Sequence, residues 1–419
     1  MHDGGVVPPG WGVIMGGLVE AANARRSVPR AIGRRARGRL IVIGSVVALS
    51  LAGVAASVPA APAAFAATLG TPAITVAGGN SVIAAQTQGN GLEFFWNQYG
   101  TNTWRAETVA GDGTTFSSPS IAQDGNSVVI AARGINNSLN FYWQSIGGTT
   151  WNPEQVAGPG TTFSAPSLTP NGNAANIVAQ GPGNSLDYYW QTNGTAPWHP
   201  EVVAGGGTTF SAPSIASNNT GPIIAAEGAS NSLDFYWQYN GNATWYPEVA
   251  AGGGTTYSQP AIINNAAGNG VNIAAEGPFD SLYFYWATNG TATWHLEDLG
   301  AAYGTPALVA WGDPRAQGVA IVTLVPFVGS STVWALQEYS AVNGSTAWTT
   351  TGPLTYASTV GTPQAVAPVT AVENNGDLNI AGTDNSGGWL LFYWQENQEA
   401  IGQAPWGPIT EENAGSLQG

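Results

Sequence analysis

Three columns of residues recur along the chain and divide it into seven units. The first column is an aromatic triplet ending in Trp, and its first five Trp residues lie 47, 47, 47 and 49 residues apart. These triplets end at Trp96, Trp143, Trp190, Trp237, Trp286 and Trp394. A second Trp column consists of Trp104, Trp151, Trp198, Trp245, Trp294, Trp348 and Trp406. A Pro column consists of Pro72, Pro119, Pro166, Pro213, Pro260, Pro306 and Pro363. A period of about 50 residues predicts a repeat fold in which each unit buries its faces against its neighbours.

Each unit has the pattern of four short strands separated by turns rich in Gly, Asn and Ser. In the fourth unit we expect strands over 213–216, 222–227, 233–238 and 245–249. The third strand places Phe235 and Trp237 on one face and Tyr236 on the other, as expected for a sheet between two other sheets. The sequence therefore predicts an all-β, seven-bladed β-propeller of four-stranded antiparallel blades, with an open β-solenoid as the alternative.

Two details of this fold are open to test. The sixth unit has drifted, and its third strand is expected over 333–339. Helical content is expected to be close to zero after residue 67, and the closed ring protects strand edges that would otherwise aggregate.

The N-terminal 66 residues have the pattern of a signal peptide. Seven Arg residues lie within 25–39, an apolar run follows over 40–58, and Ala64-Phe65-Ala66 is a small-x-small cleavage signal. We expect cleavage after Ala66, which leaves a propeller domain over 67–419 that is secreted to the extracellular space without membrane insertion. The alternative is an uncleaved membrane anchor, because the apolar run is about long enough to span a bilayer.

The charge balance excludes some partners. The chain has 10 Lys and Arg against 25 Asp and Glu, for a net charge of −15, and only Arg105, Arg133 and Arg315 lie beyond the signal segment. Such a field disfavours nucleic acid and anionic membranes. The chain has no Cys, so its stability depends on the packed core and on ring closure.

The residues do not form a recognisable catalytic or metal-binding motif. The two His residues of the propeller, His199 and His295, both follow a second-column Trp, where sister units have Asn152 or Tyr246. A position that accepts Asn, Tyr and His is typical of an exposed strand residue. No Lys or Cys nucleophile and no metal-ligand spacing is present. We therefore predict no enzyme activity, no cofactor and no metal.

Repeated polar and aromatic residues are the candidates for ligand binding. A Glu recurs three residues after the second Trp, at Glu107, Glu154, Glu201, Glu248 and Glu297. Its two interpretations are an acceptor of backbone or turn hydrogen bonds and a ligand contact beside an aromatic platform. The first Trp column is expected in the core. The second lies beside the turn after the third strand, and its two interpretations are packing between blades, which we favour, and partial exposure for ligand contact. A further polar column, expected to line the same crevice between blades, ends the second strand: Gln86, Arg133, Gln180, Glu227 and Glu276. The predicted ligand-binding residues are Trp104, Trp151, Trp198, Trp245 and Trp294, these five Glu residues, and Arg133, Gln180, Glu227 and Glu276.

The repeat resembles that of the bacterial β-propeller lectins of the Photorhabdus lectin type. The resemblance rests on Ser211-Ala212-Pro213-Ser214-Ile215-Ala216, Leu233-Asp234-Phe235-Tyr236-Trp237-Gln238, and Trp245 with the Gly-rich segment after it. It covers residues 70–413 and implies seven blades that bind fucose-type sugars between them. The family's aromatic residue after Leu is Asp234 here, and its second Trp after Trp198 is absent.

Three functions follow from these observations. The first is a secreted, non-catalytic, lectin-like propeller with repeated, weak, multivalent sites for glycans or cell-surface polysaccharide. The second is a protein-binding or cell-envelope scaffold, and the third is a glycan hydrolase or lyase. If contacts lie between similar blades, pockets should cluster around residues 90–300. The sequence leaves the oligomeric state open.

Overall fold

The computed structural model describes residues 70–97, 103–171, 175–192, 194–239, 242–264, 270–288, 293–313, 316–326, 334–351, 369–383, 389–395 and 410–417. All statements below concern these residues. The predicted signal segment lies outside them, as do Pro363 and Trp406 of the seventh unit.

The described residues form seven four-stranded antiparallel sheets, each containing four consecutive strands of the chain. Blade 1 contains β1 (Ala73–Ala77), β2 (Asn80–Gln86), β3 (Leu92–Asn97) and β4 (Trp104–Ala110); blade 2 contains β5 (Ser120–Asp124), β6 (Ser127–Arg133), β7 (Leu139–Ser145) and β8 (Asn152–Ala157). Blade 3 contains β9 (Ser167–Pro170), β10 (Ala175–Gln180), β11 (Leu186–Thr192) and β12 (Thr195–Ala204); blade 4 contains β13 (Ser214–Ser217), β14 (Pro222–Glu227), β15 (Leu233–Gln238) and β16 (Trp245–Ala251). Blade 5 contains β17 (Ala261–Asn264), β18 (Gly270–Gly277), β19 (Ser281–Thr288) and β20 (His295–Ala301); blade 6 contains β21 (Tyr303–Asp313), β22 (Ala316–Pro326), β23 (Trp334–Val342) and β24 (Thr349–Thr351). Blade 7 contains β25 (Thr370–Asn374), β26 (Asp377–Thr383), β27 (Trp389–Gln395) and β28 (Thr410–Ser416).

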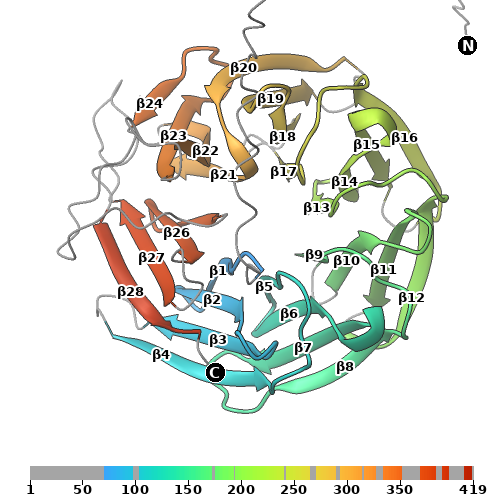
Figure 1. Cartoon of the computed structure of the whole chain (residues 1–419), viewed down its shortest axis with the longest axis vertical. Helices are drawn as coiled ribbons and strands as arrows, with labels where there is room; N and C mark the ends of the chain where they lie inside the picture. Colours follow the sequence, from blue (N-terminus) through green and yellow to red (C-terminus); the bar gives the residue numbers. More distant parts are fainter. Residues whose placement is uncertain are drawn as a thin grey trace, which may run out of the picture. The chain divides into compact units, whose positions relative to one another are not determined.

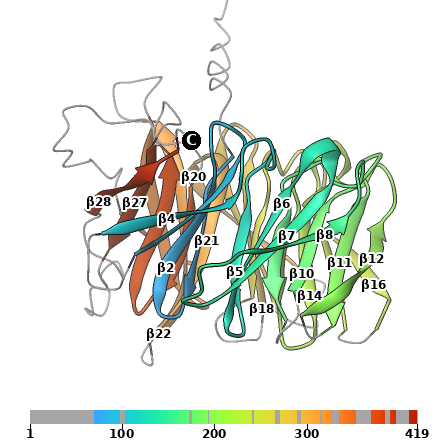
Figure 2. The ribbon, with the colours of Figure 1, turned by 90° about the horizontal axis from the view of Figure 1, so that it is seen from below.

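The seven blades form a closed ring around an axis. The first strand of each blade contacts the first strand of the next, and β1 contacts β25 to complete the ring. Figure 1 shows these first strands around the centre and the fourth strands at the rim. Figure 2 shows the strands running between the two ends of the propeller. The predicted seven-bladed propeller is thus confirmed for the described residues.

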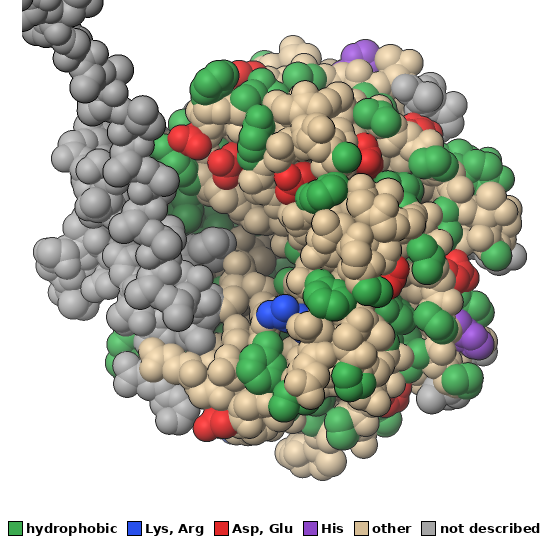
Figure 3. Space-filling view, turned by 45° about the vertical axis from the view of Figure 1, so that its right-hand side comes forward, with side chains coloured by type: hydrophobic (Ala, Val, Ile, Leu, Met, Phe, Trp, Pro, Cys, Tyr) green, Lys and Arg blue, Asp and Glu red, His purple; other side chains and the backbone are tan. Residues whose placement is uncertain are grey.

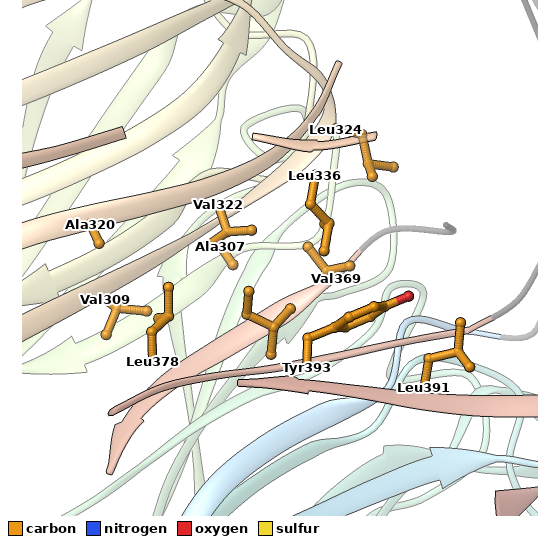
Figure 4. Packing of buried hydrophobic residues seen from close by; sticks show 11 residues of the cluster. Ala307, Val309, Ala320, Val322, Leu324, Leu336, Val369, Leu378, Leu391 and Tyr393 are labelled. Atoms are coloured by element: carbon orange, nitrogen blue, oxygen red, sulfur yellow. The ribbon is translucent and has the colours of Figure 1, made fainter. Parts of the chain in front are cut away.

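Each blade is apolar on both faces because both faces pack against other blades. On β15, Phe235 packs with Ile273 and Tyr285 of blade 5, whereas Tyr236 packs with Val178 and Tyr188 of blade 3. The sandwiched sheet predicted from the alternation of aromatic residues is therefore confirmed. Figure 4 shows the equivalent packing between blades 6 and 7.

Two further sevenfold columns form the centre of every blade. The middle of each second strand is an Ile with no exposed surface: Ile83, Ile130, Ile177, Ile224, Ile273, Ile321 and Ile380. Each third strand begins with, or close to, an equally buried Leu: Leu92, Leu139, Leu186, Leu233, Leu282, Leu336 and Leu390. Complete burial of such a side chain contributes about 1.5–3 kcal/mol, so these columns stabilise every blade to a similar degree.

The linker from one blade to the next crosses the turn between the second and third strands. At this turn, residues with a positive φ such as Asn184 (φ +63°) direct their carbonyl oxygens at the linker. The amides of Thr208 and Thr209 donate to the Asn184 carbonyl at 2.9 and 3.0 Å. Gly207 adopts φ +78°, which is favourable for Gly and costly for most other residues. The Gly-rich segments are therefore turns, as their sequence indicates.

The expected strand boundaries hold to within a few residues. In blade 4, the second and third strands match the predictions residue for residue, and the first begins one residue later, at Ser214. Pro213 has no amide hydrogen to donate to the ladder, so pairing begins after it. The third strand of blade 6 is β23, shifted towards the C-terminus from 333–339. The only helical elements described are two short 3-10 turns, Ile135–Asn137 and Ala229–Asn231, as expected.

Ring closure depends on the C-terminal residues. The Leu417 carbonyl accepts a hydrogen bond from the Gln88 amide at 3.0 Å, and the Leu417 side chain is fully buried against Ile74 and Leu390.

We expect Leu417→Ala to lower the free energy of unfolding by about 2–4 kcal/mol, because it leaves a cavity at the closing junction. Urea denaturation measures the change. Val202→Ala, at a side chain that is 67% exposed, is the control; equal midpoints for the two variants would contradict this account.

Candidate functional site

A carboxylate of the fourth strand bridges two indoles at the junctions between blades. In blade 2, Glu154 Oε1 accepts a hydrogen bond from the indole nitrogen of Trp143 at 3.0 Å. Glu154 Oε2 accepts one from Trp198 of blade 3 at 3.0 Å and one from the Gln191 amide at 3.2 Å. This Glu therefore joins a first-column Trp of its own blade to a second-column Trp of the next blade.

The same Trp–Glu–Trp bridge recurs at three more junctions. The indole-to-carboxylate distances are 2.8 Å (Trp190–Glu201), 3.1 Å (Trp245–Glu201), 2.9 Å (Trp237–Glu248), 3.4 Å (Trp294–Glu248), 3.1 Å (Trp286–Glu297) and 2.8 Å (Trp348–Glu297). At the junction of blades 1 and 2, Gln144 donates to Glu107 at 3.2 Å, and the buried indole nitrogen of Trp151 has no protein partner. The recurrent Glu is an acceptor, as one interpretation of the sequence held. Its donors are side chains, however, because the carboxylate points across the blade junction.

Second-column Trp rings pack edge-on or tilted against an aromatic ring of the preceding blade. The centroid separations are 5.2 Å (Phe94–Trp151), 5.0 Å (Phe141–Trp198), 5.0 Å (Tyr188–Trp245), 5.0 Å (Phe235–Trp294), 4.9 Å (Phe284–Trp348) and 4.8 Å (Phe392–Trp104). Such pairs contribute about 0.5–1.5 kcal/mol each beyond their burial. The last pair joins blade 7 to blade 1 and so extends the series across ring closure.

First-column Trp residues pack against the buried clusters but are themselves only partly buried, so they lie at the edge of the core that the sequence predicts for them. Each lies near the end of the third strand, and in blades 3, 4 and 5 the facing residue of the fourth strand stacks on its ring. His199 stacks on Trp190 at 4.2 Å and His295 stacks on Trp286 at 3.9 Å. Both His residues thus lie on the fourth strand directly opposite a Trp of the neighbouring third strand.

The polar residues that end the second strands hold the linkers in place. Gln180 donates to the Thr209 carbonyl at 2.6 Å and to Asn184 Oδ1 at 3.3 Å, and Arg133 donates to the Phe116 carbonyl. Asn231 donates to Glu227 Oε1 at 2.8 Å. These residues lie at the opposite end of the blade from the second-column Trp residues, because the second and third strands run in opposite directions. The structure therefore does not bring the two predicted sets together in one crevice.

Glu276 is the most strongly perturbed carboxyl group at this end. Its Oε2 accepts a hydrogen bond from the Gly304 amide at 2.5 Å. Burial raises the pKa of Glu276 from 4.5 to about 7; the Gly304 bond opposes this shift, and the nearby charge of Asp280 adds to it. Folding therefore favours the protonated carboxyl group, and the ionised form costs stability once the pH rises above the unfolded pKa.

We expect a pH-dependent loss of stability from this group. The free energy of unfolding of the wild type should fall between pH 4.5 and 7 relative to that of Glu276→Gln, by about 1–2 kcal/mol after allowance for solvent screening of a half-buried group. The variant keeps an oxygen that accepts the Gly304 hydrogen bond. Urea denaturation of both proteins at pH 5 and pH 8 measures the difference. A constant difference at the two pH values would contradict the raised pKa.

A crevice of about 310 Å³ opens between blades 5 and 6. Trp286, Phe284 and Glu297 line it from blade 5, and Trp348 and Ala341 line it from blade 6. Residues of the turn Asn343–Thr346 also line it, and the side-chain nitrogen Nδ2 of Asn343 is buried without a hydrogen-bond partner. The crevice therefore combines aromatic walls with a carboxylate.

A small residue in the drifted sixth unit contributes open space to this crevice. Strand pairing aligns Tyr339 with Tyr236, and so aligns Ala341 with Gln238. At the junctions of blades 1 to 4, a Gln at this position donates to the Glu of the preceding blade. Ala341 leaves that space open. Pockets were expected around residues 90–300. That range includes the blade 5 wall of the crevice but not the blade 6 wall, which is formed by residues of the drifted sixth unit.

Two further features of the described residues bear on function. They contain no group of three or more His, Cys, Asp or Glu side chains arranged to hold a metal ion. No helix among them has the length and apolar character needed to cross a membrane.

The fold and its junctions define a seven-bladed β-propeller in which Trp–Glu–Trp bridges join the blades at four junctions. It shares its fold with a lectin from Burkholderia pseudomallei, at a TM-score of 0.67 and 16% identity over 82% of this chain and 99% of the lectin. A six-bladed lectin from Aleuria aurantia (TM-score 0.49, 14% identity, 70% and 97% covered) and a prolyl endopeptidase (TM-score 0.49, 12% identity, 84% and 50% covered) are more distant. No protein-family model matches the sequence, and no curated protein matches it.

Proposed function

We propose that the protein is a non-catalytic, lectin-like propeller that binds neutral glycan, with its principal site in the crevice between blades 5 and 6. The observation that carries the proposal is the pair of indoles, Trp286 and Trp348, on either side of Glu297. An indole face suits the C–H face of a sugar ring, and a few fixed polar groups then select its hydroxyls. Asn343 also lines the crevice, and its side-chain nitrogen Nδ2 has no hydrogen-bond partner in the protein.

The charge of the protein narrows the ligand class. A net charge of −15 repels sulfated, uronic and sialylated glycans, so neutral glycans are favoured. The protein from Burkholderia pseudomallei that shares this fold is named a lectin, which agrees with the proposal. The repeat pattern supports placement beside the Photorhabdus lectin type.

We further propose that the other junctions hold weaker sites of the same kind, in a protein secreted after cleavage at Ala66. A shallow site with one aromatic wall binds at roughly millimolar Kd, or about −4 kcal/mol. Several such sites on one rigid ring gain about a hundredfold or more in avidity on a glycan-dense surface. The predicted Trp and Glu columns remain the candidates for these contacts.

A glycan array tests the proposal. The purified protein is applied to neutral and anionic glycans, each printed at high and low density. We expect binding to neutral glycans, stronger at high density. Indifference to every glycan, or a preference for anionic ones, would contradict the proposed function.

A further inference from the structure

Exposed aromatic side chains form an arc at the end of the propeller that carries the linkers between blades. Phe163, Phe210 and Tyr257 occupy the same place in three successive linkers and are 42%, 47% and 48% exposed. We call these three residues the aromatic arc. Phe279, in the turn between β18 and β19 at the same end of blade 5, is fully exposed. Exposed aromatic residues that repeat at the same place in successive linkers form a candidate interaction surface.

The backbone holds the aromatic arc in place. The amides of Phe163, Phe210 and Tyr257 donate to the carbonyls of Gln180, Glu227 and Glu276 at 2.8, 2.9 and 2.8 Å. The residue before each aromatic is a Thr with no exposed surface. Each aromatic ring is therefore presented by a fixed linker, which reduces the entropy that a partner must overcome on binding.

Acidic groups lie near the aromatic arc and outnumber the basic ones. Asp187, Asp234 and Glu276 are partly exposed at this end of the blades, whereas the Glu227 side chain is buried. Arg133 of blade 2 is the basic residue at this end: it donates to Asn137, whose carbonyl accepts from the amide of Thr162, next to Phe163. Figure 3 shows acidic and hydrophobic side chains around a hollow in the surface, with a basic side chain beside it. Burial raises the pKa of Asp187, Glu227 and Asp234, so a nearby cation would stabilise their charged forms.

From this juxtaposition we infer that the aromatic arc and its bordering carboxylates dock a protein segment that carries both basic and apolar side chains. Aromatic residues are enriched at protein interfaces, and cations are attracted both to carboxylates and to aromatic faces. The central hollow of about 270 Å³ at this end is lined by the first strands and their Pro residues, and the aromatic arc lies outside it. The surface is thus suited to an extended partner. It lies at the opposite end of the propeller from the crevice between blades 5 and 6, so this inference does not depend on the proposed function.

Peptide binding tests the inference. Three labelled peptides of equal length, one of Lys and Leu, one of Glu and Leu and one of Lys and Gly, are titrated into the purified protein at low and high salt. We expect the Lys–Leu peptide to bind most tightly, and its binding to be weaker at high salt than at low salt. A triple change of Phe163, Phe210 and Tyr257 to Ser should weaken it about tenfold or more.

Matched variants keep the test decisive. Val202→Ser with Val249→Ser changes side chains that are 67% and 66% exposed on fourth strands, away from the aromatic arc, and should leave binding unchanged. If the triple variant fails to fold by circular dichroism, Asp187→Asn with Asp234→Asn, at two partly exposed carboxylates, is expected to weaken binding of the Lys–Leu peptide and to reduce its salt dependence. Equal binding of all variants, or equal binding of the Lys–Gly and Lys–Leu peptides, would overturn the inference. Loss of glycan binding without loss of peptide binding in the arc variants would assign the arc to sugar instead.

Discussion

Replacing Glu154 by Ala is expected to lower the free energy of unfolding by about 3–5 kcal/mol. The carboxylate accepts three side-chain hydrogen bonds, from Trp143, Gln191 and Trp198, and two of these donors belong to the next blade. Its removal leaves three half-buried or buried donors without an acceptor at once. Hydrogen bonds to a charged group are worth about 1.5–3 kcal/mol each, and their losses at one carboxylate are not additive.

Urea denaturation measures this effect, and the same strand supplies the control. Gln155 is the exposed neighbour of Glu154 on β8, so Gln155→Ala should change the free energy of unfolding by less than about 0.5 kcal/mol. The free energy of unfolding of Glu154→Gln should lie between those of the wild type and Glu154→Ala. The Gln amide keeps one acceptor oxygen, but its NH₂ group faces a side chain that is itself a hydrogen-bond donor. A Glu154→Ala variant as stable as Gln155→Ala would show that the blades are joined by packing alone.

The second large effect is expected from Ala341→Gln. The substitution restores the residue that faces the Glu of the preceding blade at other junctions, where the Gln-to-carboxylate distances are 3.2–3.4 Å. We expect the new side chain to fill the crevice, to donate to Glu297 and to reduce glycan affinity tenfold or more, by about 1.4 kcal/mol or more. Because the added amide has an acceptor, folding should be retained.

Calorimetric titration with a neutral glycan that binds the wild type measures this loss. Val249→Gln is the control, since Val249 lies on β16 outside the lining of the crevice and is 66% exposed. A loss of binding in Ala341→Gln with binding kept in Val249→Gln would locate the principal site. Unchanged binding in Ala341→Gln would place the ligand elsewhere.

The blade architecture could be predicted from the sequence because its determinants are local and repeated. The second and third strands of blade 4 are apolar runs bounded by Gly, Asn and Ser, so their ends match the structure. The buried Ile and Leu columns, such as Ile224 and Leu233, were visible as repeats, yet the aromatic columns alone are enough to count the blades.

The candidate site could be predicted only in part, because it depends on contacts between blades. The recurrent Glu and both Trp columns are evident in the sequence, but which indole meets which carboxylate depends on the register of adjacent sheets. The crevice is lined by Ala341, whose place in the repeat is hidden by the drift of the sixth unit until strand pairing aligns it. The aromatic arc was present as a column three residues before the Pro column. The exposure of these aromatic side chains was not evident from the sequence. In each linker a completely buried Thr directly precedes the exposed aromatic residue, so burial changes from one linker residue to the next.

The most direct test of the account is a crystal structure of the protein with a neutral oligosaccharide chosen from the array. The account predicts a sugar ring in the crevice between blades 5 and 6, against Trp286 or Trp348 and within hydrogen-bond distance of Glu297 or Asn343. Sugar bound only at other places on the propeller, with this crevice containing solvent alone, would contradict it.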